Sequence, residues 1–234
     1  MTAKGVFTSF DPPGSTFTAP SFISLQGVIV GYYLDSGSIS HGFILKNGGY
    51  TTVDAPGAAG TILSGINPSG EISGATCTDA ACGNTGNSNT TESFVLSKKG
   101  NYTFFNPPGA TSSTASTVSP SGVVAGAYTD TVGELFHGYL LKHGTYTTID
   151  FPGALYGTFV GGGNPENDLT GAYNYTSSCT ADCGHAFLLS NGVYTSFDYP
   201  GATFSEGTGI NPAGVIVGVF VDSSGSVHGF VRTP

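Results

Sequence analysis

The sequence is short of charge, and of positive charge above all. Only 9 % of its 234 residues are charged, and six basic residues stand against fifteen acidic ones, which gives a net charge of −9. A surface of that sign repels phosphates, so the composition argues against a nucleic-acid-binding protein. No segment approaches the roughly 20 consecutive apolar residues that a membrane-spanning helix needs, so we expect no membrane insertion.

Several motifs of enzymes and cofactor sites are also missing. The sequence has no Gly-x-Ser-x-Gly motif, no phosphate-binding loop and no His-Glu-x-x-His motif. The glycines at 161–163 lack the strand-to-helix context that a nucleotide site requires. We therefore expect neither a cofactor nor a bound metal.

Glycine and aromatic residues are abundant instead. The chain has 37 glycines, 16 phenylalanines and 12 tyrosines, and no tryptophan. Glycine is costly inside helices and aromatic side chains favour half-buried strands, so this composition indicates sheets joined by turns. With 38 % hydrophobic residues, the chain can bury enough apolar surface to fold.

An internal repeat accounts for the whole chain. Five segments open alike and end at a Pro-Gly pair, as in GGYTTVDAPG at 48–57 and GTYTTIDFPG at 144–153. The repeat units are residues 5–47, 48–99, 100–143, 144–191 and 192–234, so residues 1–234 form a single domain. Each unit has four strand-like segments separated by turn signals such as Asn-Pro-x-Gly.

Repeats of this length with four strands each are typical of propeller blades. We predict an all-β, five-bladed β-propeller with four antiparallel strands per blade. From the axis outward we expect the Asn-Pro strand, the Val-Gly-Tyr strand, the His-Gly-Phe strand and the Tyr-Thr strand. The chain then begins with an orphan outermost strand, Val6 to Asp11, which we expect to complete the last blade. An open solenoid is disfavoured because the last unit shows no atypical polar cap.

A sequence resemblance supports this architecture. His-Ala-Phe at 185–187 and its His-Gly-Phe or His-Gly-Tyr relatives, beside Gly-Ile-Asn-Pro-x-Gly, resemble the HAF family of probable extracellular repeats. The resemblance covers all five units, although unit two has Glu92-Ser-Phe94 where histidine is expected. It implies an exported protein without established chemistry. In blade number and size the chain is also similar to tachylectin, a five-bladed animal lectin.

Repeated polar residues should gather on the disc face opposite the tight turns. We expect each repeated histidine to bond to a repeated aspartate and so to hold its blade together. A zinc ring is disfavoured because third-strand residues lie too far apart for ligand distances of about 2.1 Å. These structural residues are His41, His137, His185, His228, Asp11, Asp54, Asp150 and Asp198, with Asn106 in the aspartate position of unit three.

An aromatic column on the same face offers a ligand surface. Aromatic rings present apolar faces to sugar C–H groups, and nearby carboxylates accept hydroxyl hydrogen bonds. The same rings could equally be packed between blades, and the sequence leaves both interpretations open. The proposed binding residues are Tyr33, Asp35, Tyr128, Asp130, Tyr173, Phe220 and Asp222.

A residue used once for catalysis should break the repeat. Glu206 does so in an axial strand, and unit four has an extra residue near Tyr156. A glycoside hydrolase or lyase using this axial carboxylate is therefore an alternative, although hydrolysis ordinarily needs a second carboxylate nearby.

The cysteines lie in two local pairs within the longer units. We expect disulfides between Cys77 and Cys82 and between Cys179 and Cys183, which indicates an oxidising compartment. The N-terminus lacks the apolar core of a signal peptide, so either the chain is intracellular or a leader, absent from this chain, has been removed.

The function expected from the sequence is an extracellular ligand-binding module. We expect a secreted or periplasmic, lectin-like protein whose loop-rich face binds a neutral glycan or another small polar ligand, because scarce basic groups disfavour anionic ligands. Besides the axial hydrolase or lyase, a cell-surface scaffold that binds proteins is the other alternative.

Overall fold

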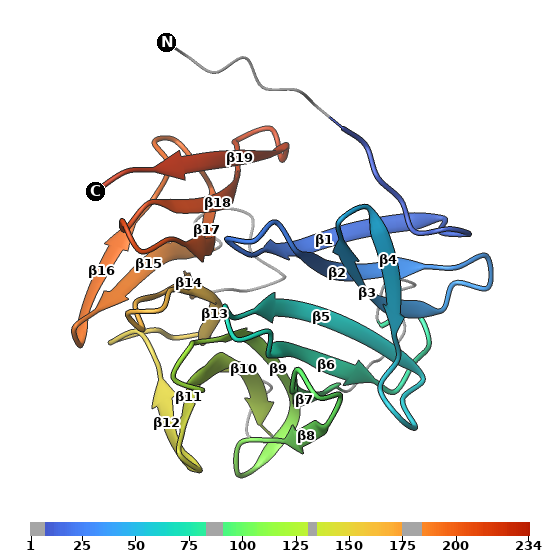
Figure 1. The fold of residues 1–234 in the computed structure, drawn as a ribbon. Coiled ribbons are helices and arrows are strands. Elements are labelled where there is room, and N and C mark those ends of the chain that lie inside the picture. The colour runs from blue at the N-terminus through green and yellow to red at the C-terminus, as the bar shows by residue number, and fades with distance from the viewer. Residues whose placement is uncertain (1–7, 83–90, 131–134, 175–183) are drawn as a thin grey trace.

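The computed structural model describes residues 8–82, 91–130, 135–174 and 184–234. In these residues the chain forms nineteen strands in five antiparallel sheets, arranged as blades around a common centre, and no helix (Figure 1). This confirms the predicted all-β, five-bladed propeller. It follows that no helix in the described ranges could span a membrane.

The strands follow the repeat in chain order. The first blade is β1 (Phe17–Ile23), β2 (Ile29–Leu34), β3 (Ser40–Lys46) and β4 (Gly49–Val53), and the second is β5 (Gly60–Ile66), β6 (Ile72–Cys77), β7 (Thr91–Leu96) and β8 (Tyr102–Phe105). The third is β9 (Ala110–Val118), β10 (Val124–Asp130), β11 (Phe136–Lys142) and β12 (Thr145–Ile149), and the fourth is β13 (Thr158–Gly163), β14 (Leu169–Tyr173), β15 (His185–Ser190) and β16 (Val193–Phe197). The fifth is β17 (Phe204–Ile210), β18 (Ile216–Val221) and β19 (Val227–Arg232).

The Asn-Pro turns link successive blades. Asn67 Oδ1 accepts the backbone N–H of Glu71 at 2.9 Å, which closes its own turn, while Asn67 Nδ2 donates to the Ser119 carbonyl of the next blade at 3.0 Å. Asn164 Nδ2 likewise donates to the Asn211 carbonyl at 3.3 Å. One side chain therefore shapes the turn and holds the neighbouring blade.

A hydroxyl on the inner strand makes a second link between blades. Thr61 Oγ1 on β5 accepts the N–H of Ala55, which lies in the loop that leaves the first blade, at 2.9 Å. Thr158 holds Phe151 in the same way at 2.8 Å. These buried hydroxyls satisfy loop N–H groups that would otherwise be costly to bury.

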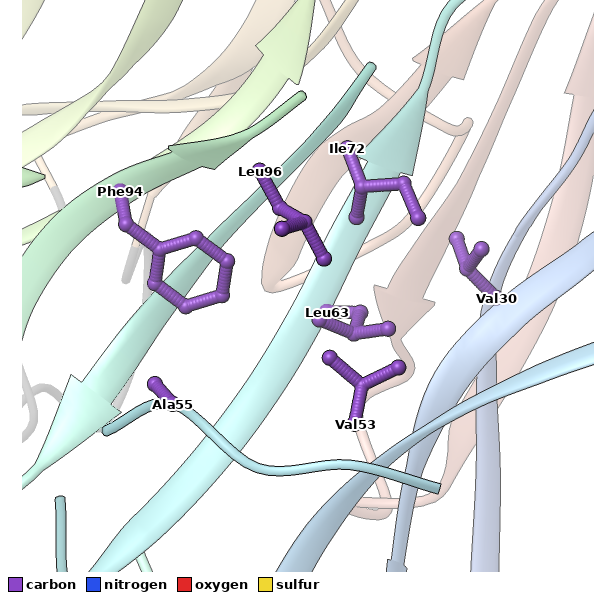
Figure 2. Close-up of a cluster of buried hydrophobic side chains, with 7 residues drawn as sticks. All are labelled: Val30, Val53, Ala55, Leu63, Ile72, Phe94 and Leu96. Carbon is purple, nitrogen blue, oxygen red and sulfur yellow. The ribbon is translucent and has the colours of Figure 1, made fainter. Parts of the chain in front are cut away.

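The hydrophobic core lies between the blades. Val30 of β2, Leu63 of β5 and Phe94 of β7 are all fully buried and belong to one cluster across the boundary of the first two blades (Figure 2). Burying each such side chain contributes about 1.5–3 kcal/mol. A Cβ atom at Gly42 on β3 would lie only 2.8 Å from Leu63 Cγ, so glycine in the His-Gly-Phe motif permits this close approach.

The boundary between the last and first blades differs from the other four. The inner strands β5, β9, β13 and β17 each contact strands of the preceding blade. On β1, however, Ile23 is 62 % exposed, and on β19 both Val227 and Val231 are 68 % exposed. Apolar residues on both sides of this boundary, which we call the seam, therefore remain in contact with solvent.

The prediction that the N-terminal strand completes the last blade is not met in the described residues. Residues 8–11 form no strand, residues 6 and 7 lie outside the described part, and the last sheet has three strands. Phe10 instead packs edge-on against Phe43 at 6.4 Å, and Asp11 accepts a hydrogen bond from Thr18 at 2.7 Å. These local contacts hold the segment on the first blade, whereas pairing with β19 would have to join the two ends of the chain.

Candidate functional site

Three blades carry the same polar cluster on the loop-rich face, and the fifth blade carries a variant of it. A histidine at or beside the start of the third strand bonds through Nδ1 to the aspartate that follows the fourth strand. The Nδ1-to-carboxylate distances are 2.8 Å for His41–Asp54, 3.0 Å for His137–Asp150 and 2.8 Å for His185–Asp198. In the fifth blade, which lacks a fourth strand, His228 Nε2 bonds to Asp222 at 3.0 Å instead. Asp11 makes its bond to Thr18, so it does not act as the aspartate of the last blade.

Some clusters contain a second carboxylate. Asp35 lies 3.6 Å from His41 Nε2, and Asp130 lies 3.6 Å from His137 Nε2. Asp35 Oδ1 also accepts two backbone N–H groups of its own turn, and the bond from Ile39 is the main cause that holds its pKa below the usual value. At Asp222 the bond from the Ser224 hydroxyl is the largest cause of a pKa held well below the usual range, followed by the bond from His228. These carboxylates already have partners within the protein.

The repeated aromatic rings are covered by neighbouring rings. The Tyr173 ring lies between the rings of Phe151 and His185, with centroid distances of 3.7 Å and 5.2 Å. Phe220 is stacked between Tyr199 at 3.8 Å and His228 at 4.9 Å in the same way.

The other two rings of the column are also engaged. Tyr33 is only 8 % exposed, stacks on His41 at 5.1 Å and contacts the Thr52 hydroxyl at 3.1 Å. Tyr128 stacks on His137 at 5.1 Å. Neighbouring side chains therefore cover ring faces on which a sugar would have to pack. This holds for all four predicted aromatic residues, Tyr33, Tyr128, Tyr173 and Phe220.

The second blade replaces the whole cluster. Glu92 pairs with Thr76 at the register position where His41 pairs with Tyr33 in the first blade. Phe104, which pairs with Phe94, occupies the position that Thr52 has in the first blade. Asn106, just after β8, occupies the position of Asp54 after β4. A tyrosine, a histidine and an aspartate are thereby exchanged for threonine, glutamate and asparagine. This is also the blade in which the sequence departs from the His-Gly-Phe motif.

A cavity of about 720 Å³ lies where the cluster is replaced. Its lining includes Thr76, Glu92, Phe104 and Asn106, together with Cys77 and Thr111. The large tyrosine and histidine side chains that fill this space in other blades are absent here, so the exchange accounts for the opening. We call it the blade-two cavity.

The side chains of the blade-two cavity offer complementary hydrogen-bonding groups. In the described part of the chain the Glu92 carboxylate has no hydrogen-bond or ion-pair partner, so it is a free acceptor. Asn106 Oδ1 accepts a hydrogen bond from the Ser113 hydroxyl at 2.6 Å, and its amide N–H groups have no hydrogen-bond partner in the described part of the chain. The Phe104 ring is 38 % exposed and rests on Tyr102, with 5.7 Å between centroids. The cavity thus combines an acceptor, a donor and an apolar ring.

A disulfide forms part of the cavity wall. Cys77 and Cys82 are bonded, as expected from the sequence, and Cys77 lines the blade-two cavity. Within the closed loop, the Ala80 carbonyl accepts the N–H of Ser40 on the first blade at 2.6 Å. The predicted Cys179–Cys183 bond lies outside the described residues. Among those described, no group of three histidine, cysteine or acidic side chains could hold a metal ion.

The axial carboxylate lies apart from the blade-two cavity. Glu206 on β17 is partly buried, and the loss of solvent around its carboxyl raises its pKa from 4.5 to about 7. Its Oε1 atom would lie 3.3 Å from a Cβ atom at Gly161 on β13. Tyr156 is 53 % exposed and lies in the loop before β13. It forms no hydrogen bond with Glu206. The described residues therefore give Glu206 no catalytic partner.

Comparison with known proteins reveals likeness of fold without likeness of sequence. No family model and no curated protein matches the sequence, so membership of the HAF family is not shown. AofleA from Arthrobotrys oligospora is similar in structure with a TM-score of 0.56 and 12 % identity, over 97 % of this chain and 73 % of that one. A lectin from Aleuria aurantia, in complex with α-methyl-L-fucoside, gives a TM-score of 0.52 and 13 % identity over 92 % and 72 %. TolB from Acinetobacter baumannii gives 0.55 and 12 % over 93 % and 56 %.

Proposed function

We propose that this chain is a lectin-like carbohydrate-binding propeller that holds one sugar residue in the blade-two cavity. The observation that carries the proposal is the replacement of the repeated Tyr-His-Asp cluster by Thr76, Glu92, Phe104 and Asn106 around an open cavity. An exposed ring beside a free carboxylate and an amide suits the apolar face and the hydroxyls of a sugar. The fold likeness to a lectin that binds a fucoside supports the same class of ligand.

The proposal places binding at one blade instead of around the whole ring. In the other blades, rings such as Phe220 are stacked on both faces and carboxylates such as Asp198 are bonded to histidines. A sugar there would have to displace those contacts, whereas the blade-two cavity is already open. We therefore expect a single site per chain. The disulfide at its edge supports a secreted or periplasmic location, since such bonds persist in oxidising compartments.

The test is a variant that restores the repeat. Changing Thr76→Tyr, Glu92→His, Phe104→Thr and Asn106→Asp gives the second blade the set found in the first, at positions with the same strand register. We expect this variant to fold and to lose glycan binding on an array and in NMR titration. A control that changes Glu166→Gln on the opposite face should bind as the wild type does. Retained binding in the restored variant would contradict the proposal.

The alternative of an axial glycoside hydrolase has one observation in its favour, the raised pKa of Glu206. A carboxylic acid that stays protonated near neutral pH could act as a general acid. Hydrolysis would need a second carboxylate about 5–10 Å away. Turnover of a chromogenic glycoside by the wild type, lost in Glu206→Gln, would favour the enzyme over the lectin.

A further inference from the structure

The basic side chains of the described residues lie on the tight-turn face of the disc, opposite the blade-two cavity, where Glu71 also lies beside Lys98 and Lys99. The third strand of each blade runs from the loop-rich face to the tight turns, and the basic residues follow its far end. In the described ranges none of these residues forms an ion pair with a carboxylate. They are Lys46, Lys98, Lys99, Lys142 and Arg232.

The lysines are too distant to neutralise the blade-two cavity. Glu92 lies near the start of β7 and Lys98 lies just beyond its far end. At about 3.3 Å per residue, six residues of extended chain separate the two by roughly 20 Å. The screening length at physiological salt is about 8 Å, so the two charges hardly interact. Among the described residues that line the blade-two cavity there is no lysine, arginine or histidine.

The partner that the Glu92 carboxylate lacks could come from the ligand. An exposed aromatic ring attracts a cation through its π-electrons, and Phe104 lines the cavity with Glu92. Tyr102, stacked behind Phe104 with its ring tilted by only 7°, supports the orientation of that ring. A carboxylate and an aromatic face together recognise an ammonium group, while the ring also meets the C–H groups of a sugar.

We infer that the blade-two cavity takes a sugar that carries a free, protonated amino group. This inference rests on the proposed carbohydrate-binding function and specifies its ligand as an amino sugar of the glucosamine type, in place of the neutral glycan expected from the sequence. Glu92 pairs with the ammonium group, Phe104 packs on the sugar ring, and the Asn106 amide donates to a hydroxyl. N-acetylation removes the positive charge and with it the contribution of Glu92.

The experiment compares two oligosaccharides that differ at the amino group, which is free and charged in one and N-acetylated in the other. A glucosamine tetrasaccharide and an N-acetylglucosamine tetrasaccharide are titrated against the whole chain at pH 6 by calorimetry. We expect the amine form to bind about tenfold more tightly at low salt, and the ratio to shrink in 0.5 M sodium chloride. Glu92→Gln should remove the ratio while weak binding of the acetylated form remains. Glu166→Gln on the opposite face removes the same charge and should preserve the ratio.

The outcomes separate the inference from the proposed function. Equal affinities for the two sugars, or a ratio that survives in Glu92→Gln, would overturn the inference and leave a lectin of neutral glycans. Absence of binding by either sugar and by a wider glycan array would overturn both. A tetralysine peptide that binds as tightly as the amino sugar, with the same dependence on Glu92, would show that charge alone is recognised and would also overturn the inference.

Discussion

Glu92 stands opposite Thr76 on neighbouring strands, at the position where His41 stands opposite Tyr33 one blade earlier. In the first blade the two rings stack at 5.1 Å and fill the space above the sheet. In the second blade the shorter threonine leaves that space open and the glutamate without a partner. The same backbone register therefore produces a closed cluster in one blade and a cavity in the next.

The histidine–aspartate bonds should matter for stability and not for binding. We expect Asp54→Ala, which removes the partner of His41 in the first blade, to lower the free energy of unfolding by about 1 kcal/mol or less, because both side chains are partly exposed. Urea unfolding measures this change. Glycan affinity should stay at the wild-type value, and a loss of affinity would mean that the repeated clusters take part in recognition.

Gly42 should be harder to replace than the matching glycine of the last blade, because the second blade packs closely against it. At Gly42 a Cβ atom would lie 2.8 Å from both Leu63 Cγ and the Val53 carbonyl oxygen, so Gly42→Ala should destabilise the fold by about 1–3 kcal/mol. The matched control is Gly229→Ala on β19, where the nearest atom would lie at 3.8 Å. We expect thermal unfolding to show little change for the control. Equal losses in the two variants would indicate that the seam is packed in solution.

The partly buried Glu206 carboxyl should make stability depend on pH. Its pKa is about 7 in the folded state against 4.5 for the ordinary group. Between pH 4.5 and 7 the folded protein therefore binds more protons than the unfolded chain. Stability is therefore greatest below pH 4.5 as far as this group is concerned, and falls as the pH rises from about 4.5 to 7. Glu206→Gln should remove this slope and stabilise the protein at pH 8 by roughly 1–3 kcal/mol. Denaturant unfolding across that range tests it, and identical pH profiles for the two proteins would contradict it.

Loss of the Cys77–Cys82 disulfide should weaken both the fold and the site. The bond closes a short loop, for which the chain-entropy estimate is about 2 kcal/mol. The loop also carries the Ala80 carbonyl that binds Ser40, so its release should loosen one wall of the cavity. We expect Cys77→Ser with Cys82→Ser to unfold at lower urea concentration and to bind glycan less tightly. Unchanged glycan affinity in a folded double variant would show that the wall forms without the bond.

The repeat made most of the fold predictable, because turn signals and alternating strands recur in every unit. The site was harder to recognise, although Glu92 and Asn106 had each been noted as departures from the pattern. They fall in different repeat units, since the fourth strand of a blade comes from the unit after it. The expected blade order already placed both departures in the second blade, and the pairing of β7 with β8 confirms it. The strand pattern does not reveal that the smaller side chains leave a cavity there. The N-terminal strand was mispredicted because strand pattern alone does not reveal where Phe10 finds its contact.

The seam has a consequence for how the molecule loses structure. In a closed propeller every blade packs against two neighbours. Here the first and last blades each have only one well-packed neighbour. The protein should then behave as a linear array whose ends open before its middle, as in solenoids. Amide hydrogens of β18 and of β2 would exchange with deuterated water sooner than those of β10, and protection would rise toward the third blade.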